Sequence, residues 1–157
     1  MNLKETIQNL ADEIFPEILE IRRYIHQHPE LSFHEHKTAE YICEVLGKEN
    51  IAYRKGIAGT GILADIEGRG SGRIVGLRAD MDALPIQEEN TVAYRSVNDG
   101  KMHACGHDVH TACLIGAARI LNQLMDQFSG KVKLIFQPAE EKAPGGARLM
   151  LKENLFG

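Results

Sequence analysis

Residues 102–110, with the sequence MHACGHDVH, decide how the rest of the chain is interpreted. These nine positions hold one thiol, three imidazoles and a carboxylate, a combination with few uses other than binding a metal ion. Apolar residues then recur at three- and four-residue steps, which predicts an amphipathic helix from Asp108 to about Phe128. The candidate ligands therefore lie at the start of a long helix. Its predicted buried stripe comprises Val109, Ala112, Cys113, Gly116, Ala117, Ile120, Leu121 and Leu124.

Cys105 and His107 form the first half of the predicted metal site. The helix N-terminus and a metal ion would both lower the pKa of the thiol, so that Cys105 could bind as a thiolate. His107 would bind through one ring nitrogen, and its other nitrogen needs a hydrogen-bond acceptor. Asp80, Asp82 and Asp108 are the candidate acceptors.

The same pair has a simpler interpretation, in which Cys105 is a small buried residue and His107 caps the helix. Two ligands by themselves define a site only loosely. His103 and His110 in the same stretch, together with a pair of glutamates further along the chain, favour the metal site.

Residues 136–141, FQPAEE, provide the second half of the predicted site. Glu140 and Glu141 follow a short buried strand over 131–136, and the carboxyl ends of strands are a usual place for chemistry in α/β sheets. One carboxylate can bind the ion while the other accepts a proton from water. The alternative is a solvated acidic turn, because glutamate is usually exposed.

Periodicity predicts two helices near the amino terminus, over residues 3–25 and 37–46. The first is expected to bend or restart at Pro16, which has no N–H to donate, and to stop before Pro29. Gly47 is the expected end of the second.

Two β-branched runs, over 61–67 and 73–79, are joined by a glycine-rich connection and predict a hairpin-like pair of strands. A loop with a short strand near Val92 follows, and a last helix is expected over 145–153. Helices alternating with strands indicate an α/β fold.

Several other polar residues are candidates for the site. Asp80 and Asp82 end a predicted strand and are favoured as site residues, although aspartate also favours plain turns. Cys43 and Cys113 lie on apolar helix faces and are expected in the core. An exposed loop between two helices accommodates histidine freely, so a metal site is not favoured for the remaining histidines. These are His26, His28, His34 and His36.

Composition narrows the class of protein. The 157 residues carry a net charge of −4, without the basic surface that nucleic acid or an anionic membrane requires. The longest apolar run is too short for a membrane span, and the amino terminus lacks the features of a secretory signal. Three cysteines, an odd number, fit reduced thiols and a cytoplasmic location better than disulfides.

Four motifs in this order resemble the amidohydrolase branch of the aminoacylase/carboxypeptidase metallopeptidases. This branch includes hippurate hydrolase, N-acetyldiaminopimelate deacetylase and the indole-acetyl-amino-acid hydrolases. The matching stretches are HPELSF (28–33), RADMDALP (78–85), MHACGHD (102–108) and FQPAEE (136–141). The resemblance extends over essentially the whole chain.

The resemblance implies that Cys105, His107 and Glu141 are metal ligands, that Glu140 is the general base and that Asp82 orients the site. It implies hydrolysis of the amide bond of an N-acyl amino acid, a small-molecule substrate. The cofactor would be a divalent metal, zinc or manganese, with up to two ions in the complete family enzyme. Other branches have a ligand histidine at the position of Asp80, so Asp80 is not assigned as a ligand.

Family members are more than twice as long as this chain. The resemblance therefore implies that residues 1–157 are the amino-terminal part of a metallopeptidase-like catalytic domain. A mixed central sheet flanked by helices is expected, without the later strands, two further ligand histidines and the lid domain through which the family often dimerises. We expect weak or absent hydrolysis from this chain. The alternatives are a non-catalytic fragment that folds fully only with missing segments or a partner, and a thiol redox protein, which is disfavoured because there is no Cys-x-x-Cys pair.

Overall fold

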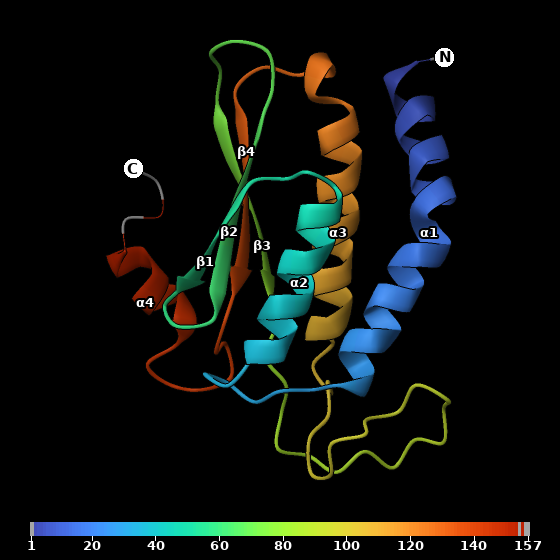
Figure 1. The fold of residues 1–157 in the computed structure, drawn as a ribbon, viewed down its shortest axis with the longest axis vertical. Coiled ribbons are helices and arrows are strands. Elements are labelled where there is room, and N and C mark those ends of the chain that lie inside the picture. The colour runs from blue at the N-terminus through green and yellow to red at the C-terminus, as the bar shows by residue number, and fades with distance from the viewer. Residues whose placement is uncertain (1, 154, 156–157) are drawn as a thin grey trace.

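The computed structural model describes residues 2–153 and 155, and it shows an α/β fold around a mixed four-stranded sheet (Figure 1). The predicted fold class and the mixed sheet are confirmed. None of the helices in the described part of the chain has the length and apolar character needed to cross a membrane. The elements in chain order are α1 (Leu3–Gln27), α2 (His36–Lys48), β1 (Tyr53–Ile57), β2 (Gly61–Glu67), β3 (Ile74–Asp80), α3 (His107–Gln123), the short 3-10 helix η1 (Met125–Gln127), β4 (Lys131–Gln137) and α4 (Gly146–Lys152).

The strand order is β1-β2-β4-β3, which corrects the expected hairpin between β2 and β3. β4 lies between them, antiparallel to β2 and parallel to β3. Six of its seven residues are buried, whereas most of β3 is exposed or half-buried. A strand in the middle of a sheet is covered by two neighbouring strands and by the layers packed on both faces, which accounts for the burial of β4. Proximity in sequence alone suggested the hairpin.

Alternate residues of the strands pack on opposite faces of the sheet, as strand geometry requires. Ile62 and Ile66 of β2 belong to the main core, which is formed with α1, α2 and α3. Leu63, between them, packs with Met150 of α4 in a smaller cluster. In Figure 1 these three helices lie on one side of the sheet and α4 on the other.

Some expectations about single segments were wrong. β1 was not predicted, because four of its five residues are exposed and show no apolar alternation. The chain near Val92 forms turns instead of a strand. α1 continues through Pro16 without a restart, and α2 continues one residue past Gly47. Cys113 is exposed, not part of the core.

The start of α4 leaves no room for a side chain at Gly146, because a Cβ there would collide with the carbonyl of Pro138. Replacing Gly146 with alanine is expected to destabilise the protein by about 1–3 kcal/mol, since the contacting atoms are backbone and must shift. The free energy of unfolding from urea titration measures this.

Gly47→Ala is the matched control for this substitution. Gly47 lies in α2, and a Cβ there meets open space. Alanine at that position should stabilise the protein by about 0.5–1 kcal/mol, because glycine is unfavourable inside a helix. A Gly146→Ala protein as stable as the wild type would contradict the close packing of α4 on the end of β4.

Candidate metal centre

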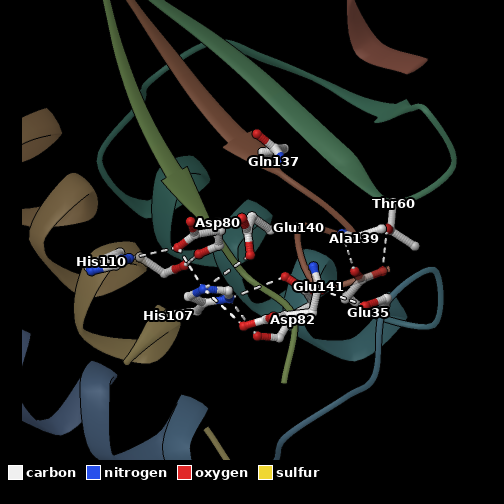
Figure 2. Close-up of polar contacts among 12 residues, drawn as sticks. Glu35, Thr60, Asp80, Asp82, His107, His110, Gln137, Ala139, Glu140 and Glu141 are labelled. Atoms are coloured by element: carbon white, nitrogen blue, oxygen red, sulfur yellow. Dashed lines mark hydrogen bonds and ion pairs between the residues drawn. The ribbon is translucent and has the colours of Figure 1, made fainter. Parts of the chain in front are cut away.

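The carboxyl ends of β3 and β4 meet at one edge of the sheet, because the two strands are parallel and Asp80 pairs with Gln137. The chain beyond each strand carries carboxylates, and α3 begins beside them with His107. Figure 2 shows the side chains of Asp80, Asp82, His107 and the two glutamates gathered at this edge. It is the position at which open α/β sheets place their ligands.

His107 is held by Asp82. Its Nδ1 donates to the backbone oxygen of Asp82 at 2.8 Å and lies 3.2 Å from the Asp82 carboxylate. Of the three candidate acceptors, Asp82 therefore fills the role. The Nε2 atom is turned towards three carboxylates, with Asp80 at 3.6 Å, Glu141 at 3.7 Å and Glu140 at 3.9 Å. Burial lowers the pKa of His107, but the bond to Asp82 and the nearby charges of Asp80 and Asp82 outweigh it, so that its pKa is raised.

Asp82 is almost fully buried and joins several parts of the site. Its Oδ2 accepts from the hydroxyl of Ser32 at 2.6 Å and from the backbone N–H of Glu141 at 3.0 Å. Burial would raise the pKa of this carboxyl, yet the bonds from His107, Ser32 and the backbone of Glu141 and Glu140 hold it far below its usual value. Asp82 is therefore a fixed anion that orients the imidazole.

Glu140 and Glu141 approach His107 from the loop after β4. The Glu141 side chain is 23% exposed and that of Glu140 is 42% exposed. One potential ligand atom from each glutamate and from His107 lie within 4.8 Å of one another. Carboxylate oxygens and an imidazole nitrogen at this spacing suit a divalent cation. The structure thus brings together three of the residues predicted for the site.

Cys105 lies at the edge of this group. Its side chain is exposed and hydrogen-bonded to Glu141, but it is not among the side chains whose ligand atoms cluster around His107. The bond to Glu141, some burial and the charges of Glu141, Glu140 and Asp82 raise the pKa of its thiol to about 11. The helix N-terminus was expected to lower the pKa of this thiol. Its effect is outweighed, because the carboxylates are the stronger charges among the protein's own groups.

Asp80 and His110 form a second group with His107, again with ligand atoms within 4.8 Å of one another. Asp80 accepts from Nδ1 of His110 at 2.7 Å and pairs with Arg78 at 2.7 Å. The backbone oxygen of Asp80 accepts from the hydroxyl of Thr111 at 2.8 Å, which ties β3 to the first turns of α3. Asp80 thus lines the site while its carboxylate already has two protein partners.

A buried ion cluster lies behind the site. Asp108 does not orient His107 but accepts from His26 at 2.8 Å and pairs with Arg22 at 2.8 Å, both residues of α1. The other nitrogen of His26 donates to Glu88 at 3.0 Å. The expectation that His26 lies in an exposed loop was therefore wrong, because it is a buried residue of α1. The bond to Asp108 raises the pKa of His26, although burial opposes this. His103 is buried nearby, and burial lowers its pKa to about 4.

Sequence reasoning missed Ser32 and Glu35, which support the site from the loop between α1 and α2. The resemblance of residues 28–33 to a family motif pointed to this segment but not to its chemistry. His34 and His36, in the same stretch, are exposed and lie outside both ligand groups found among the described residues.

Comparison with known proteins places the chain in a family of metallopeptidase type. The sequence model of Peptidase family M20/M25/M40 matches residues 76–157, and the chain belongs to this family. It is 48% identical over 153 residues to an N-acyl-L-amino acid amidohydrolase of Geobacillus stearothermophilus, a match that covers 98% of this chain and 41% of the relative. It is 45% identical over 141 residues to an N-acetyl-L-cysteine deacetylase of Bacillus subtilis, covering 90% of this chain and 34% of the relative.

The fold is shared with solved structures of the family. A dinuclear metal-binding peptidase of the M20 family from Bacillus subtilis superposes with a TM-score of 0.88 at 44% identity, covering 93% of this chain and 41% of that one. The recognised resemblance is thereby confirmed. The chain spans between 34% and 41% of the length of these three relatives.

Proposed function

We propose that this chain carries metal-binding and proton-transfer groups for the metal-dependent hydrolysis of the amide bond of N-acyl amino acids. The observation that supports this most is the gathering of Glu140 and Glu141 around Nε2 of His107, whose other nitrogen is held by Asp82. The substrate class follows the names of the amidohydrolase and deacetylase relatives.

The proposed metal ligands are Cys105, His107 and Glu141. Their donor set fits a divalent cation, because negative charge is concentrated around Nε2 of His107, which has carboxylate oxygens at 3.6, 3.7 and 3.9 Å. Thiolate and imidazole favour zinc, whereas the carboxylates also suit manganese. Two ions are proposed for the complete enzyme, in line with the dinuclear peptidase from Bacillus subtilis.

When bound, the metal would act as a Lewis acid that polarises the amide carbonyl and acidifies water. Glu140, the more exposed of the two glutamates, is the proposed general base: it accepts a proton from the attacking water and returns it to the leaving nitrogen. Asp82 keeps the proton of His107 on Nδ1, so that Nε2 presents its lone pair to the site.

We further propose that the 157-residue chain alone binds metal weakly and hydrolyses little. The non-catalytic alternative, in which a partner or further segment completes the fold, is favoured by one observation. β3 is an edge strand that exposes Ile74 (58%) and Val75 (49%), and apolar edge strands invite pairing with another strand.

Three free thiols also support a reducing compartment such as the cytoplasm.

Metal analysis of the purified protein tests the proposed function. Cys105→Ala is expected to lower zinc affinity by at least about tenfold, since it removes a proposed ligand beside Glu141. Cys113→Ala is the matched control, because Cys113, in α3, is also an exposed thiol but lies outside the ligand groups. Zinc affinity is measured by calorimetric titration, and turnover is assayed with N-acetyl and N-benzoyl amino acids.

Equal affinities for zinc in the wild type, Cys105→Ala and Cys113→Ala would contradict the assignment of Cys105. A wild-type protein that takes up neither zinc nor manganese would contradict a metal site in this chain. Robust turnover with tightly held, stoichiometric zinc would instead overturn the proposal that the chain alone is weakly active.

A further inference from the structure

Glu35 is a fully buried carboxylate that the proposed reaction does not use. It occupies the N-cap position of α2, yet its side chain makes no capping bond to that helix. Its Oε2 accepts from the hydroxyl of Thr60 at 2.8 Å, and its Oε1 accepts from the backbone N–H of Ala139 at 2.7 Å. Figure 2 shows the carboxylate of Glu35 facing both Thr60 and Ala139, next to residues 139–141, which we call the glutamate loop. Because burying a carboxylate is costly unless it is hydrogen-bonded, this arrangement needs an explanation.

Ala139 is an unusual partner. It immediately precedes Glu140 and has a φ of +47°, in the left-handed region that residues with a Cβ rarely adopt. Its N–H is held by Glu35, and its carbonyl accepts from the N–H of Gly146 at 2.9 Å. The side chain of Ala139 is fully buried. Backbone strain of this kind persists only where the surroundings enforce it, and such positions gather at functional sites.

The left-handed residue lies where the chain leaves β4. A residue in this conformation changes the direction of the backbone, so that the following residues do not continue the strand. The next two residues are Glu140 and Glu141, which approach Nε2 of His107 to within 3.9 and 3.7 Å. The conformation of Ala139 therefore determines where both carboxylates lie.

The segment that carries Glu35 also supports the other half of the site. Ser32 donates to the carboxylate of Asp82, and Asp82 in turn holds His107 and the backbone of Glu141. The backbone oxygen of Glu30 accepts from the N–H of Ala83. One loop between α1 and α2 thus contacts the chain after β3 and the chain after β4.

We propose that Glu35 is a positioning residue: by holding Ala139 in the left-handed conformation, it places the carboxylates of Glu140 and Glu141 opposite His107. The inference rests on the proposed function, because it assigns Glu35 a role in preparing the metal site. If Glu35 only stabilised the core, loss of its bond to Thr60 and loss of its bond to Ala139 would affect zinc binding to the same extent. If it positions the glutamates, only the bond to Ala139 matters for metal binding.

Three variants of the 157-residue protein separate these roles: Glu35→Ala, Glu35→Gln and Thr60→Val. Glu35→Ala removes both bonds, and zinc affinity is expected to fall by about 10–100-fold, the usual effect of losing a residue that orients ligands. Thr60→Val removes only the hydroxyl partner of Glu35. It is expected to lower the melting temperature while leaving zinc affinity unchanged.

Two readouts are measured for every variant: zinc affinity by calorimetric titration, and the chemical shift of the Ala139 amide proton by NMR without metal. A charge-assisted bond at 2.7 Å should shift this proton strongly downfield. The downfield shift should disappear in Glu35→Ala and persist in Thr60→Val. Glu35→Gln retains a weaker, neutral acceptor, so both readouts should be intermediate and show partial rescue.

The proposal is overturned if Glu35→Ala keeps the wild-type zinc affinity, or if Thr60→Val weakens zinc binding as much as Glu35→Ala does. Should the alanine variant fail to fold, Glu35→Gln decides: an unchanged Ala139 proton and unchanged zinc affinity would overturn the proposal. If the wild type binds no zinc, the proposed function fails by itself. The Ala139 shift then still tests whether Glu35 holds the glutamate loop.

Discussion

Exchanging Glu141 for glutamine is expected to weaken zinc binding by at least about 100-fold, whereas the same exchange at Glu140 should cost less than about tenfold. Each variant removes one negative charge from adjacent residues, so long-range electrostatics are closely matched. The difference comes from geometry. Glu141 is the less exposed residue, its backbone is tied to Asp82, and its carboxylate lies between His107 and the thiol of Cys105.

For the rate of hydrolysis at saturating metal the order should be reversed, with the larger loss in Glu140→Gln. Hydrolysis of an N-acyl amino acid should fall by about 10²–10⁴-fold in Glu140→Gln at saturating metal, because the glutamine side chain cannot accept a proton from water as the glutamate does. Zinc affinity is read from calorimetric titration and turnover from long incubations with excess zinc. Equal losses of zinc affinity in the two variants would contradict the division of roles between ligand and base.

Replacing Asp108 with asparagine is expected to destabilise the protein by about 3–5 kcal/mol, the usual cost of removing one partner from a buried ion pair. The asparagine keeps the volume but removes the charge that Arg22 and His26 share. The carboxylate of Asp108 is fully buried, and it connects the start of α3 to the end of α1. The free energy of unfolding from urea titration measures the effect.

The loss of stability in Asp108→Asn should depend on pH, because His26, one of the two partners of Asp108, is titratable. Its pKa is raised above 6.5, chiefly by the bond to Asp108, so its stabilising contribution is complete below pH 6.5 and is lost as the pH rises through the folded-state pKa. The destabilisation by Asp108→Asn should therefore be largest below pH 6.5 and should decrease as the pH rises through the folded-state pKa of His26, because Asp108 then has Arg22 as its one cationic partner.

Asp126→Asn is the control for the buried pair. Asp126 forms an ion pair with Arg69 at 3.0 Å, but both side chains are more than 70% exposed. Removing its charge should cost less than about 1 kcal/mol, because solvent screens the pair. A cost for Asp108→Asn that is no larger than for Asp126→Asn would show that the ion cluster behind the site contributes little to the fold.

Parts of the site that are close in sequence were predictable. His107 and the helix after it follow from a local pattern, and Glu140 and Glu141 follow from a short apolar strand. Neighbouring residues lie close together in any fold, so such pairs need no knowledge of the tertiary structure. Asp82 was one of three candidate acceptors for His107, and only the resemblance to a known family singled it out, because nothing local shows which of the three reaches the imidazole.

The contacts between distant segments were not predictable. The bond between His26 and Asp108 joins residues 82 positions apart, and the bond between Glu35 and Ala139 joins residues 104 positions apart. His26 was expected in an exposed loop because the apolar periodicity that predicted the first helix ended at Ile25. Its burial depends on the packing of α1 against α3, which no local pattern encodes.

The sequence by itself determined the α/β class, the long helix that begins at the candidate site and the presence of two ligand-rich stretches, because each depends on periodicity or on adjacent residues. Only the tertiary structure decided that β4 lies between β2 and β3 and therefore ends beside Asp80. The choice of strand partners depends on burial summed over the whole sheet. That choice brings His107 and the two glutamates together and lets Glu35 reach the loop that carries them.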